Sequence, residues 1–351
     1  MTRVDPAAGL AAFDRLRRGA PAPAWVRDGI LRGWGLPADA AATLIVLSEN
    51  ITFRVDVGDV PTLVVRLGRP GYAGGVDHLR AELLWVEALR ADIDAPTPSP
   101  VRGADGALVQ RLPDESGRTW TAVAFEFVVG TILEEQPDIA RHFASIGRLT
   151  AQLHEHARSW DPPEDFVRFE WRVRDMVGAD ARWGDWRAAA LSDAEREMLE
   201  RAEVAARASL DAAGVDRSPA HAGLIHADLR PSNVMTTTDA ANPLVVIDFD
   251  DCGHGFYLYD FAAALTFYEH RPEALEMAGR WIDGYTQIRP LSTHDLAAAA
   301  ALSLLRRLTM LGWATTHRAD ALPSDLWDEN LPGTVEVGRR YLSDPLRIVR
   351  G

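Results

Sequence analysis

The stretch His226-Ala227-Asp228-Leu229-Arg230-Pro231-Ser232-Asn233 is followed by the apolar run Leu244-Val245-Val246-Ile247, which ends in Asp248. The first stretch has the pattern His-x-Asp-x-x-x-x-Asn. Together the two place Asp228, Asn233 and Asp248 on neighbouring loop ends. Phosphoryl transfer from a nucleotide needs one carboxylate to orient and deprotonate a hydroxyl, and an amide with a second carboxylate to hold Mg²⁺. The pattern therefore predicts Asp228 as the catalytic base, and Asn233 and Asp248 as oxygen ligands of the metal.

Two further residues near this set are assigned supporting roles. His226 is interpreted as a structural residue that packs and bonds the loop, rather than as a second base. Asp260 lies at the start of a predicted helix at residues 259–267. A carboxylate at this position is typical of a helix cap, and we expect Asp260 to brace the catalytic loop.

Acceptor contacts are less clearly marked in the sequence. Asp251 follows closely behind Asp248 and is a candidate contact for a cationic substrate. Trp171, Trp183 and Trp186 come from a polar, loop-like stretch, and Trp171 is the candidate substrate contact among them. The alternative for these tryptophans is burial in the core.

Composition excludes several classes of protein. The 351 residues favour two lobes, and 47% apolar residues provide a sizeable core. A net charge of −14 argues against a nucleic-acid partner and is compatible with a cationic small substrate, although solubility alone is the ordinary explanation. The single Cys252 excludes an internal disulfide. No signal peptide is visible, and the longest apolar run, 296–305, ends at two arginines and is too short for a bilayer. We expect a cytoplasmic protein without a membrane partner.

The first part of the chain predicts an α+β lobe. Runs rich in β-branched residues are separated by short polar turns, which is typical of antiparallel strands, and one amphipathic stretch interrupts them. The predicted strands are 43–47, 52–57, 63–67, 108–111 and 121–129; the predicted helices are 7–18, 24–34 and 76–89. We expect a helical extension at 1–40 and a nucleotide-binding sheet at 41–129.

The remainder, 130–351, predicts a mostly helical lobe that carries the catalytic loop and the acceptor site. Apolar residues recur at helical spacing through most of it. The predicted helices are 139–156, 194–213, 259–267, 273–285 and 296–317. The two lobes together indicate a protein-kinase-like architecture.

A cation at the end of a strand is a candidate phosphate contact. Arg66 follows the apolar run Leu63-Val64-Val65 and would pair the α- and β-phosphates of the nucleotide. Glu82, expected on the polar side of helix 76–89, would orient it. The alternative is a surface salt bridge, which contributes little to stability.

Main-chain and loop groups complete the predicted nucleotide site. The connector 126–130 would offer main-chain groups of Glu126 and Val128 to adenine, with a buried strand as the alternative. Asn50 ends the turn Ser48-Glu49-Asn50, where a phosphate-covering loop is expected, but this turn has no Gly-x-Gly. No Gly-x-x-x-x-Gly-Lys-Ser/Thr occurs, so the chain is not a P-loop enzyme.

At these residues the sequence resembles the kinase-like phosphotransferase family, which includes aminoglycoside and choline kinases, type II homoserine kinases and the bacterial stress-response kinase. The resemblance extends from about residue 48 to about residue 285. Residues 64–72 look like the third strand of the family, 225–234 look like its catalytic loop, and 247–260 look like its metal-binding segment, closest to the homoserine-kinase and stress-kinase branch.

The resemblance implies a two-lobed fold that binds ATP and Mg²⁺ and transfers phosphate to a hydroxyl. One departure is that the phosphate-anchoring lysine of the family is Arg66 here. Arginine keeps the charge, but it is longer and planar, so the exchange is not conservative at a phosphate site.

Three functional hypotheses follow. The first is an ATP- and Mg²⁺-dependent kinase whose acceptor is a small molecule: an aminoglycoside-like antibiotic, an amino alcohol or a homoserine-like metabolite. The second is a protein Ser/Thr kinase of the stress-response type, using the same machinery. The third is a non-catalytic nucleotide-binding pseudokinase, which Arg66 and the glycine-poor first turn would favour.

Overall fold

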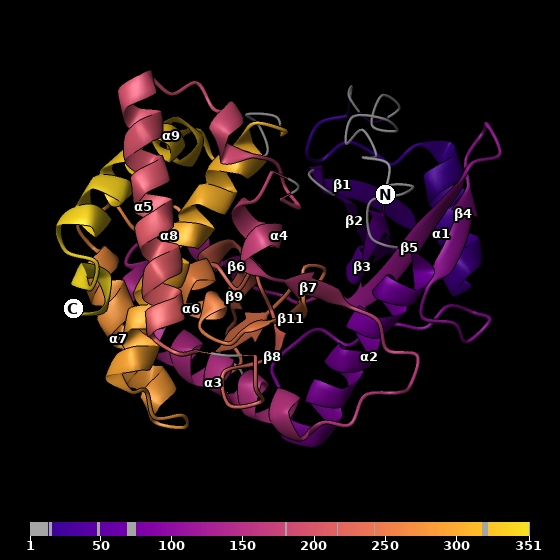
Figure 1. The fold of residues 1–351 in the computed structure, drawn as a ribbon. Coiled ribbons are helices and arrows are strands. Elements are labelled where there is room, and N and C mark those ends of the chain that lie inside the picture. The colour runs from indigo at the N-terminus through magenta and orange to yellow at the C-terminus, as the bar shows by residue number, and fades with distance from the viewer. Residues whose placement is uncertain are drawn as a thin grey trace. The chain divides into compact units, whose positions relative to one another are not determined.

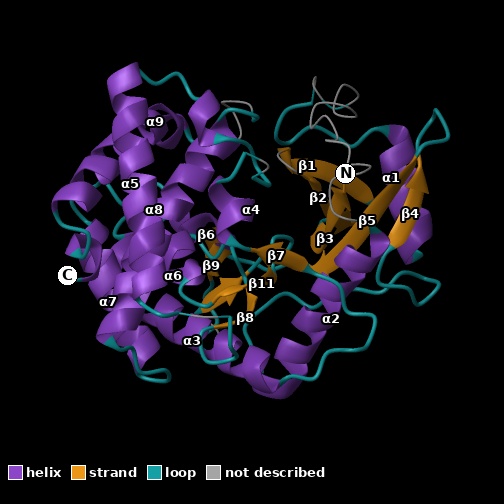
Figure 2. Cartoon of the chain, viewed as in Figure 1, coloured by secondary structure: helices purple, strands orange, loops and turns teal. Residues whose placement is uncertain are grey.

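A computed structural model describes residues 13, 16–47, 50–68, 75–179, 181–215, 217–241, 243–317 and 322–350. The chain forms two compact units. The sheet unit is Met1–Gly130 with Pro162–Arg168, and the helical unit is Thr131–Asp161 with Phe169–Gly351. Strands dominate the first and helices the second (Figure 1, Figure 2). The predicted α+β class, with an antiparallel N-terminal sheet and a mostly helical C-terminal region, is confirmed.

The sheet unit is built on five antiparallel strands in the order β1-β2-β3-β5-β4. Their bounds are β1 (Ala41–Leu47), β2 (Asn50–Val57), β3 (Val60–Gly68), β4 (Gln110–Pro113) and β5 (Thr119–Glu126). Between β2 and β3, Gly58 has a φ of 60°, a left-handed conformation that glycine adopts without strain. β2 and β3 pair along both strands, with one register shift between Val55 and Asp56.

Helices cover both faces of this sheet. Val65 and Leu67 of β3 belong to the core cluster that α1 (Ala24–Trp34) shares with the sheet, so α1 packs within the sheet unit. The amphipathic helix α2 (Val76–Ile93) packs on other strand residues through a separate cluster. Because side chains alternate along a strand, Arg66 points away from the face of Val65 and Leu67. That places Arg66 on the face covered by α2.

Two small sheets lie in the helical unit. The first has the strand order β10-β9-β6 and is antiparallel, with bounds β6 (Thr131–Ile132), β9 (Val234–Thr236) and β10 (Leu244–Val246). The second has the order β7-β11-β8, with bounds β7 (Phe169–Trp171), β8 (Ala222–Ile225) and β11 (Gly253–Phe256). These short strands hold the connections that carry the predicted catalytic residues.

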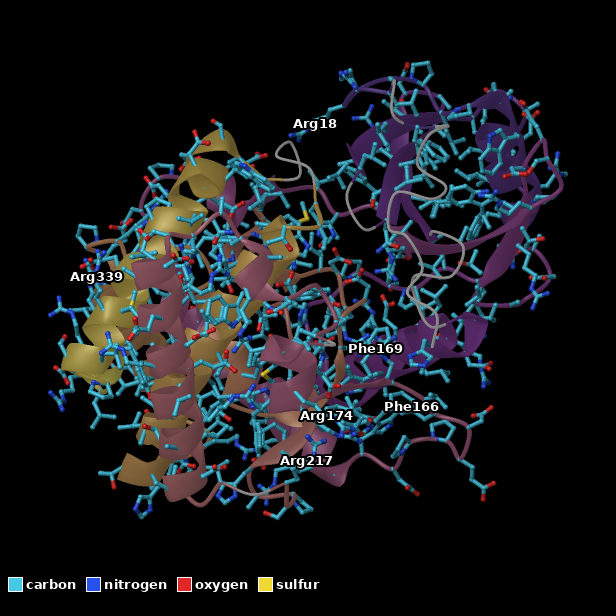
Figure 3. All side chains as sticks on the ribbon, turned by 45° about the horizontal axis from the view of Figure 1, so that its top comes forward. Arg18, Phe166, Phe169, Arg174, Arg217 and Arg339 are labelled. Carbon is cyan, nitrogen blue, oxygen red and sulfur yellow. The ribbon has the colours of Figure 1, made fainter. Side chains whose placement is uncertain are left out.

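Seven α-helices among the described residues build the rest of this unit. They are α3 (Phe143–Ser159), α4 (Val173–Val177), α5 (Asp193–Ala212), α6 (Tyr259–Ala264), α7 (Ala274–Thr286), α8 (Thr293–Ala314) and α9 (Ser324–Ser343). Outer helix faces carry charged side chains such as Arg339 on α9, which is 60% exposed and lies 4.0 Å from Glu336 (Figure 3). Exposed pairs of this kind contribute little to stability.

The central element is α8, which contacts α4, α5, α6 and α9. It begins with a capping box between Ser292 and Asp295, and it runs past the two arginines that interrupt its apolar sequence. By length and composition α8 could cross a membrane, but 89% of its most apolar 18-residue stretch is buried inside the protein. Packing in a protein core accounts for the same apolarity. Arg306 and Arg307 are themselves fully buried.

Some predicted elements end elsewhere. Strand β5 stops at Glu126 rather than at residue 129, and α6 stops at Ala264, shortly before Phe267 adopts a left-handed φ of 72°. Helix α9, which contains Pro332, was not among the predicted helices. Most of the predicted helix 7–18, and the turn residues 48–49, lie outside the described residues.

Candidate active site

Asp228 and Asn233 lie on the loop that leaves β8 and passes through the 3-10 turn η4 (Pro231–Asn233) into β9. The side-chain amide of Asn233 donates to the main-chain oxygen of Asp228 at 2.8 Å and to its carboxylate Oδ2 at 2.8 Å. The Asn233 main-chain N–H donates to the carbonyl of Arg230 at 2.8 Å. The loop is therefore folded on itself, with the Asp228 carboxylate fixed and 17% exposed.

The hairpin of β9 and β10 brings Asp248 next to this loop. Val246 pairs with Val234, and the Ile247 N–H donates to the Asn233 carbonyl at 2.9 Å. Asp248 comes directly after, is exposed, and has a φ of 61°, a left-handed conformation that aspartate tolerates better than most residues. The amide and the second carboxylate thus lie at adjacent strand ends.

His226 ties the two loop ends together. Its Nε2 lies 3.1 Å from the Ile247 carbonyl, and its Nδ1 accepts from the Asp228 N–H at 3.3 Å. Because a carbonyl can only accept, Nε2 carries the proton and Nδ1 is the acceptor. The side chain is fully buried and its ring packs on Phe249. Both nitrogens are used within the fold, so His226 braces the loop.

Asp260 holds the loop from the other side. One carboxylate oxygen accepts from the Ala227 N–H at 2.7 Å, and the other accepts from the His226 N–H at 2.9 Å. Ala227 has a φ of 67°, a left-handed conformation that costs a non-glycine residue about 1 kcal/mol or more. Asp260 is fully buried on α6, and its two bonds stabilise this bend.

Asp260 is in turn held by a hydrogen-bonded relay. His154 of α3 places Nε2 3.0 Å from Asp260 Oδ2 and Nδ1 2.9 Å from the hydroxyl of Tyr285 on α7. Burial lowers the pKa of His154 below its usual 6.5, although the bond to Asp260 opposes this shift. A neutral ring donates from Nε2 to the carboxylate and accepts from the tyrosine at Nδ1, so every polar group of the relay is satisfied.

Arg306 of α8 contacts the Asp228 carboxylate directly. Its Nη2 pairs with Asp228 Oδ1, and its Nη1 donates to the Ala227 carbonyl at 3.2 Å and to the Tyr259 hydroxyl at 3.2 Å. Its Nε donates to Thr266 Oγ1 at 3.2 Å. The guanidinium is fully buried although its partner carboxylate is partly open to solvent.

A second charged pair lies beside Asp228. Arg230 Nε is 3.6 Å from Asp228 Oδ2, and its Nη1 is 3.8 Å from Glu134 Oε1, on the 3-10 turn η1 (Leu133–Glu135). Burial raises the pKa of the Glu134 carboxyl; Arg230 opposes the shift and Asp228 adds to it. The Asp228 carboxylate therefore has a cation and a further carboxylate on its flank.

In the sheet unit, Arg66 and Glu82 form a buried pair with an Nη2–Oε2 distance of 2.6 Å. Arg66 is 5% exposed and Glu82 is fully buried, so the expectation of Glu82 on the polar side of its helix is wrong, and so is the surface salt bridge. The residues are 16 positions apart, and strand alternation turns Arg66 toward the helix that carries Glu82.

The other residues predicted for the nucleotide lie in the same unit. Asn50 begins β2, is 6% exposed, and pairs in register with Gly68 at the end of β3. The Glu126 N–H donates to the Ser99 carbonyl at 2.9 Å. The main chain leaves the sheet after Glu126, so Val128 lies beyond the strand rather than within it.

The predicted acceptor contacts differ in exposure. Asp251 is half-buried, and its carbonyl accepts from the indole N–H of Trp171 at 2.8 Å. Trp171 is fully buried and packs on Trp183 and Tyr259, and Trp186 is also buried. The structure places Trp171 in the core, and this burial argues against its assignment as a substrate contact.

The donor set at the loop ends suits a hard divalent cation. Because the amide nitrogen of Asn233 donates to Asp228, its amide oxygen remains for a ligand, and the Asp248 carboxylate is exposed. Within the described ranges, no cluster of three or more His, Cys, Asp or Glu could hold a metal. A site with two protein oxygens fits Mg²⁺, which keeps waters and takes phosphate oxygens as its other ligands.

The sequence interpretation overlooked three contributors: Arg306, His154 and Glu134. The available signal for Arg306 was an arginine pair inside an otherwise apolar helix, because buried charges require partners. His154 falls on the apolar stripe of its helix, one turn after the buried Thr150. No signal in the sequence points to Glu134.

Comparisons with known proteins show which family and which fold this chain is similar to. The profile of a family described as "Phosphotransferase enzyme family" matches residues 46–291. A homoserine kinase from Rhodospirillum rubrum is 30% identical over 261 residues, which are 72% of this chain and 70% of that protein. The structure of a microcompartment-associated aminopropanol kinase has a TM-score of 0.81 and 33% identity, covering 92% of this chain and 98% of that one. An amicoumacin kinase in complex with AMP-PNP, Ca²⁺ and Ami shares the fold, with a TM-score of 0.70, 17% identity, and coverage of 90% and 92%.

Proposed function

Because the chain belongs to the phosphotransferase enzyme family, we propose that it transfers the γ-phosphate of ATP to the hydroxyl of a small amino alcohol, with Mg²⁺ as the metal. Membership makes the protein a small-molecule phosphotransferase of the kinase type. The choice of amino alcohol, ATP and Mg²⁺ is the part proposed here.

The observation that supports this function most strongly is the state of Asp228. Its carboxylate is held by Asn233 and Arg306, yet it keeps 17% of its surface open. An acceptor hydroxyl would donate its hydrogen bond to this carboxylate. As the hydroxyl oxygen bonds to the γ-phosphorus, the bond to the leaving ADP oxygen breaks and the proton passes to Asp228. Little covalent chemistry is required of the protein, so fixed orientation is its main contribution.

Asn233 and Asp248 would hold the metal through their side-chain oxygens, and the metal would neutralise charge on the phosphates. In the sheet unit, Arg66 oriented by Glu82 is proposed as the phosphate contact. Asn50 is proposed as a further nucleotide contact, together with the main chain of Glu126 and Val128.

The amino-alcohol class is supported by two comparisons and by charge. Homoserine and aminopropanol, named in two of the proteins compared above, both carry an amine and a hydroxyl. Glu134 also lies on the flank of Asp228, but it faces Arg230 and burial raises the pKa of its carboxyl. The half-buried Asp251 is therefore the proposed contact for the cationic amine of the acceptor.

The test is ADP release by the purified full chain with ATP and Mg²⁺. The panel would contain aminopropanol, homoserine, a cationic aminoglycoside, a neutral sugar and a serine-containing peptide. We expect turnover with the amino alcohols and a loss of about 10²- to 10⁴-fold for Asp228→Asn. Asp283→Asn, an exposed aspartate of α7, is the matched control and should retain full turnover.

Other outcomes would assign the function differently. Phosphorylation of the peptide but of no small molecule would favour a protein kinase. ATP binding without transfer to any acceptor, equal in wild type and Asp228→Asn, would favour the non-catalytic alternative.

A further inference from the structure

We propose that Arg306 is the positioning residue of the active site, fixing both the Asp228 carboxylate and the strained peptide before it. This inference rests on the proposed function for its kinetic consequences. Its structural basis is independent of the acceptor, because all of the contacts involved lie within the described helical unit.

Nearly all the hydrogen-bonding groups of the Arg306 guanidinium have a partner. Nη2 pairs with Asp228 Oδ1, Nη1 reaches the Ala227 carbonyl and the Tyr259 hydroxyl, and Nε reaches Thr266. Its carbon Cζ lies 4.9 Å from the Trp183 ring centroid and 5.5 Å from that of Tyr259. A planar guanidinium held by four partners and two rings has one orientation, so it imposes that orientation on the carboxylate it binds.

Arg306 and Asp260 act on opposite ends of one residue. Asp260 accepts from the Ala227 N–H, and Arg306 donates to the Ala227 carbonyl. Ala227 has a left-handed φ of 67°. Strain of this kind persists only where the surroundings over-determine the conformation. Two buried ionic side chains do so here, and the bend they maintain directs the next residue, Asp228.

The same contacts decide where an acceptor can bind Asp228. A carboxylate has about four lone-pair positions. Arg306 uses one on Oδ1 and Asn233 uses one on Oδ2. A hydroxyl can therefore bond only at the remaining positions, on the open side of the group. Arg306 thus restricts the approach of the acceptor without touching it.

The adjacent Arg307 offers an internal control. It is equally buried on the same helix, and its Nη1 donates to Glu269 at 2.8 Å. Its other described hydrogen-bond partners are Thr334 and the carbonyls of Glu329 and Asn330, all on α9, and its Cζ lies 5.7 Å from the Phe267 ring centroid. Arg307 therefore matches Arg306 in residue type, burial and ionic pairing, but it pairs away from the catalytic loop.

The experiment compares Arg306→Met, Arg306→Lys and Arg307→Met in the full chain, at a temperature where circular dichroism shows each variant folded. We expect Arg306→Met to lower kcat by about 100-fold, the scale of a misplaced reactive group, with KM for ATP within about threefold of wild type. Arg307→Met should melt earlier but keep the wild-type kcat.

Arg306→Lys keeps the charge but not the planar contacts, and it should retain partial activity. It therefore still tests the inference if Arg306→Met does not fold. Equal kcat losses in Arg306→Met and Arg307→Met would overturn the inference while leaving the proposed function intact. If the wild type transfers no phosphate, the proposed function fails, and a crystal structure of the Arg306 variant decides the inference. We expect Ala227 to leave the left-handed region and the carboxylate to rotate; an unchanged loop would refute the role.

Discussion

Each unit contains a buried arginine paired with a carboxylate, and the two pairs are used differently. In the sheet unit, Arg66 and Glu82 are both buried, at 5% and 0% exposure. In the helical unit, Arg306 is fully buried but its partner Asp228 remains 17% exposed. The first pair is closed and joins a strand to a helix. The second is open on one side, so a buried cation presents a carboxylate to solvent.

The difference lies in how the partners are supported. Arg66 and Glu82 are 16 residues apart on a strand and on the helix that packs on its sheet, so strand alternation and this packing bring them together. Arg306 and Asp228 are 78 residues apart, and Asp228 lies on a loop. An open pair on a loop needs the extra bonds from Asp260 to Ala227 and His226. We therefore expect the geometry of the Arg306–Asp228 pair to depend on the residues around it. The Arg66–Glu82 pair should be held by the strand and the helix that carry its two members.

The largest expected effect is that of Asp260→Ala. It leaves three buried donors unpaired: the N–H groups of His226 and Ala227, and Nε2 of His154. At roughly 1–3 kcal/mol per donor, we expect a loss of about 5 kcal/mol in unfolding free energy, together with loss of phosphoryl transfer. Urea denaturation and the ADP-release assay would measure both.

Asp211→Ala, at an exposed position of α5, is the control and should change the unfolding free energy by less than about 0.5 kcal/mol. A stable and active Asp260→Ala protein would show that the open pair needs no support, and the contrast between the two regions would be lost.

The second prediction concerns the closed pair. Arg66→Met leaves the Glu82 carboxylate buried and unpaired, so we expect a cost of about 3 kcal/mol. Arg66→Lys keeps a cation and should recover most of that stability and most of the ATP-dependent turnover. Denaturation curves and KM for ATP would separate the two substitutions. If Arg66→Lys proved as damaging as Arg66→Met, the planar guanidinium rather than the charge would be what this position requires.

The parts that sequence could predict are those set by local rules. The strands of the sheet unit, the helix 24–34 and the motif at Asp228 follow from periodicity, turn residues and spacing, and the family resemblance is confirmed by the match to residues 46–291. The burial of Glu82 was missed because the charge suggested a solvent face, whereas Arg66 supplies a partner.

The support around Asp228 could not be predicted in the same way. The contact of His154 with Asp260 spans 106 residues, and that of Arg306 with Asp228 spans 78. Such contacts form only when helices pack, and no local pattern reports on them. Helix α9 was not predicted from the sequence. Its internal Pro332 is tolerated because packing against α5 and α8 stabilises the helix.

The smallest expected effect is a pH dependence of the unfolding free energy. It comes from His154, which supports the Arg306–Asp228 pair through Asp260. Burial lowers the pKa of His154 below 6.5, so between its folded pKa and 6.5 the unfolded chain binds a proton that the folded chain does not. His154 therefore favours the folded state fully above pH 6.5, and stability falls as the pH drops below it, by at most about 1.4 kcal/mol per pH unit.

His154→Gln removes this titration, so its cost in unfolding free energy should shrink from pH 7 to pH 5. His142 and His270 also have lowered pKa values through burial, but they are present in both proteins and cancel in the difference. A cost that stayed constant from pH 8 to pH 5 in urea denaturation would mean that the His154–Asp260 contact is not sensitive to protonation, and the relay would then be a packing contact alone.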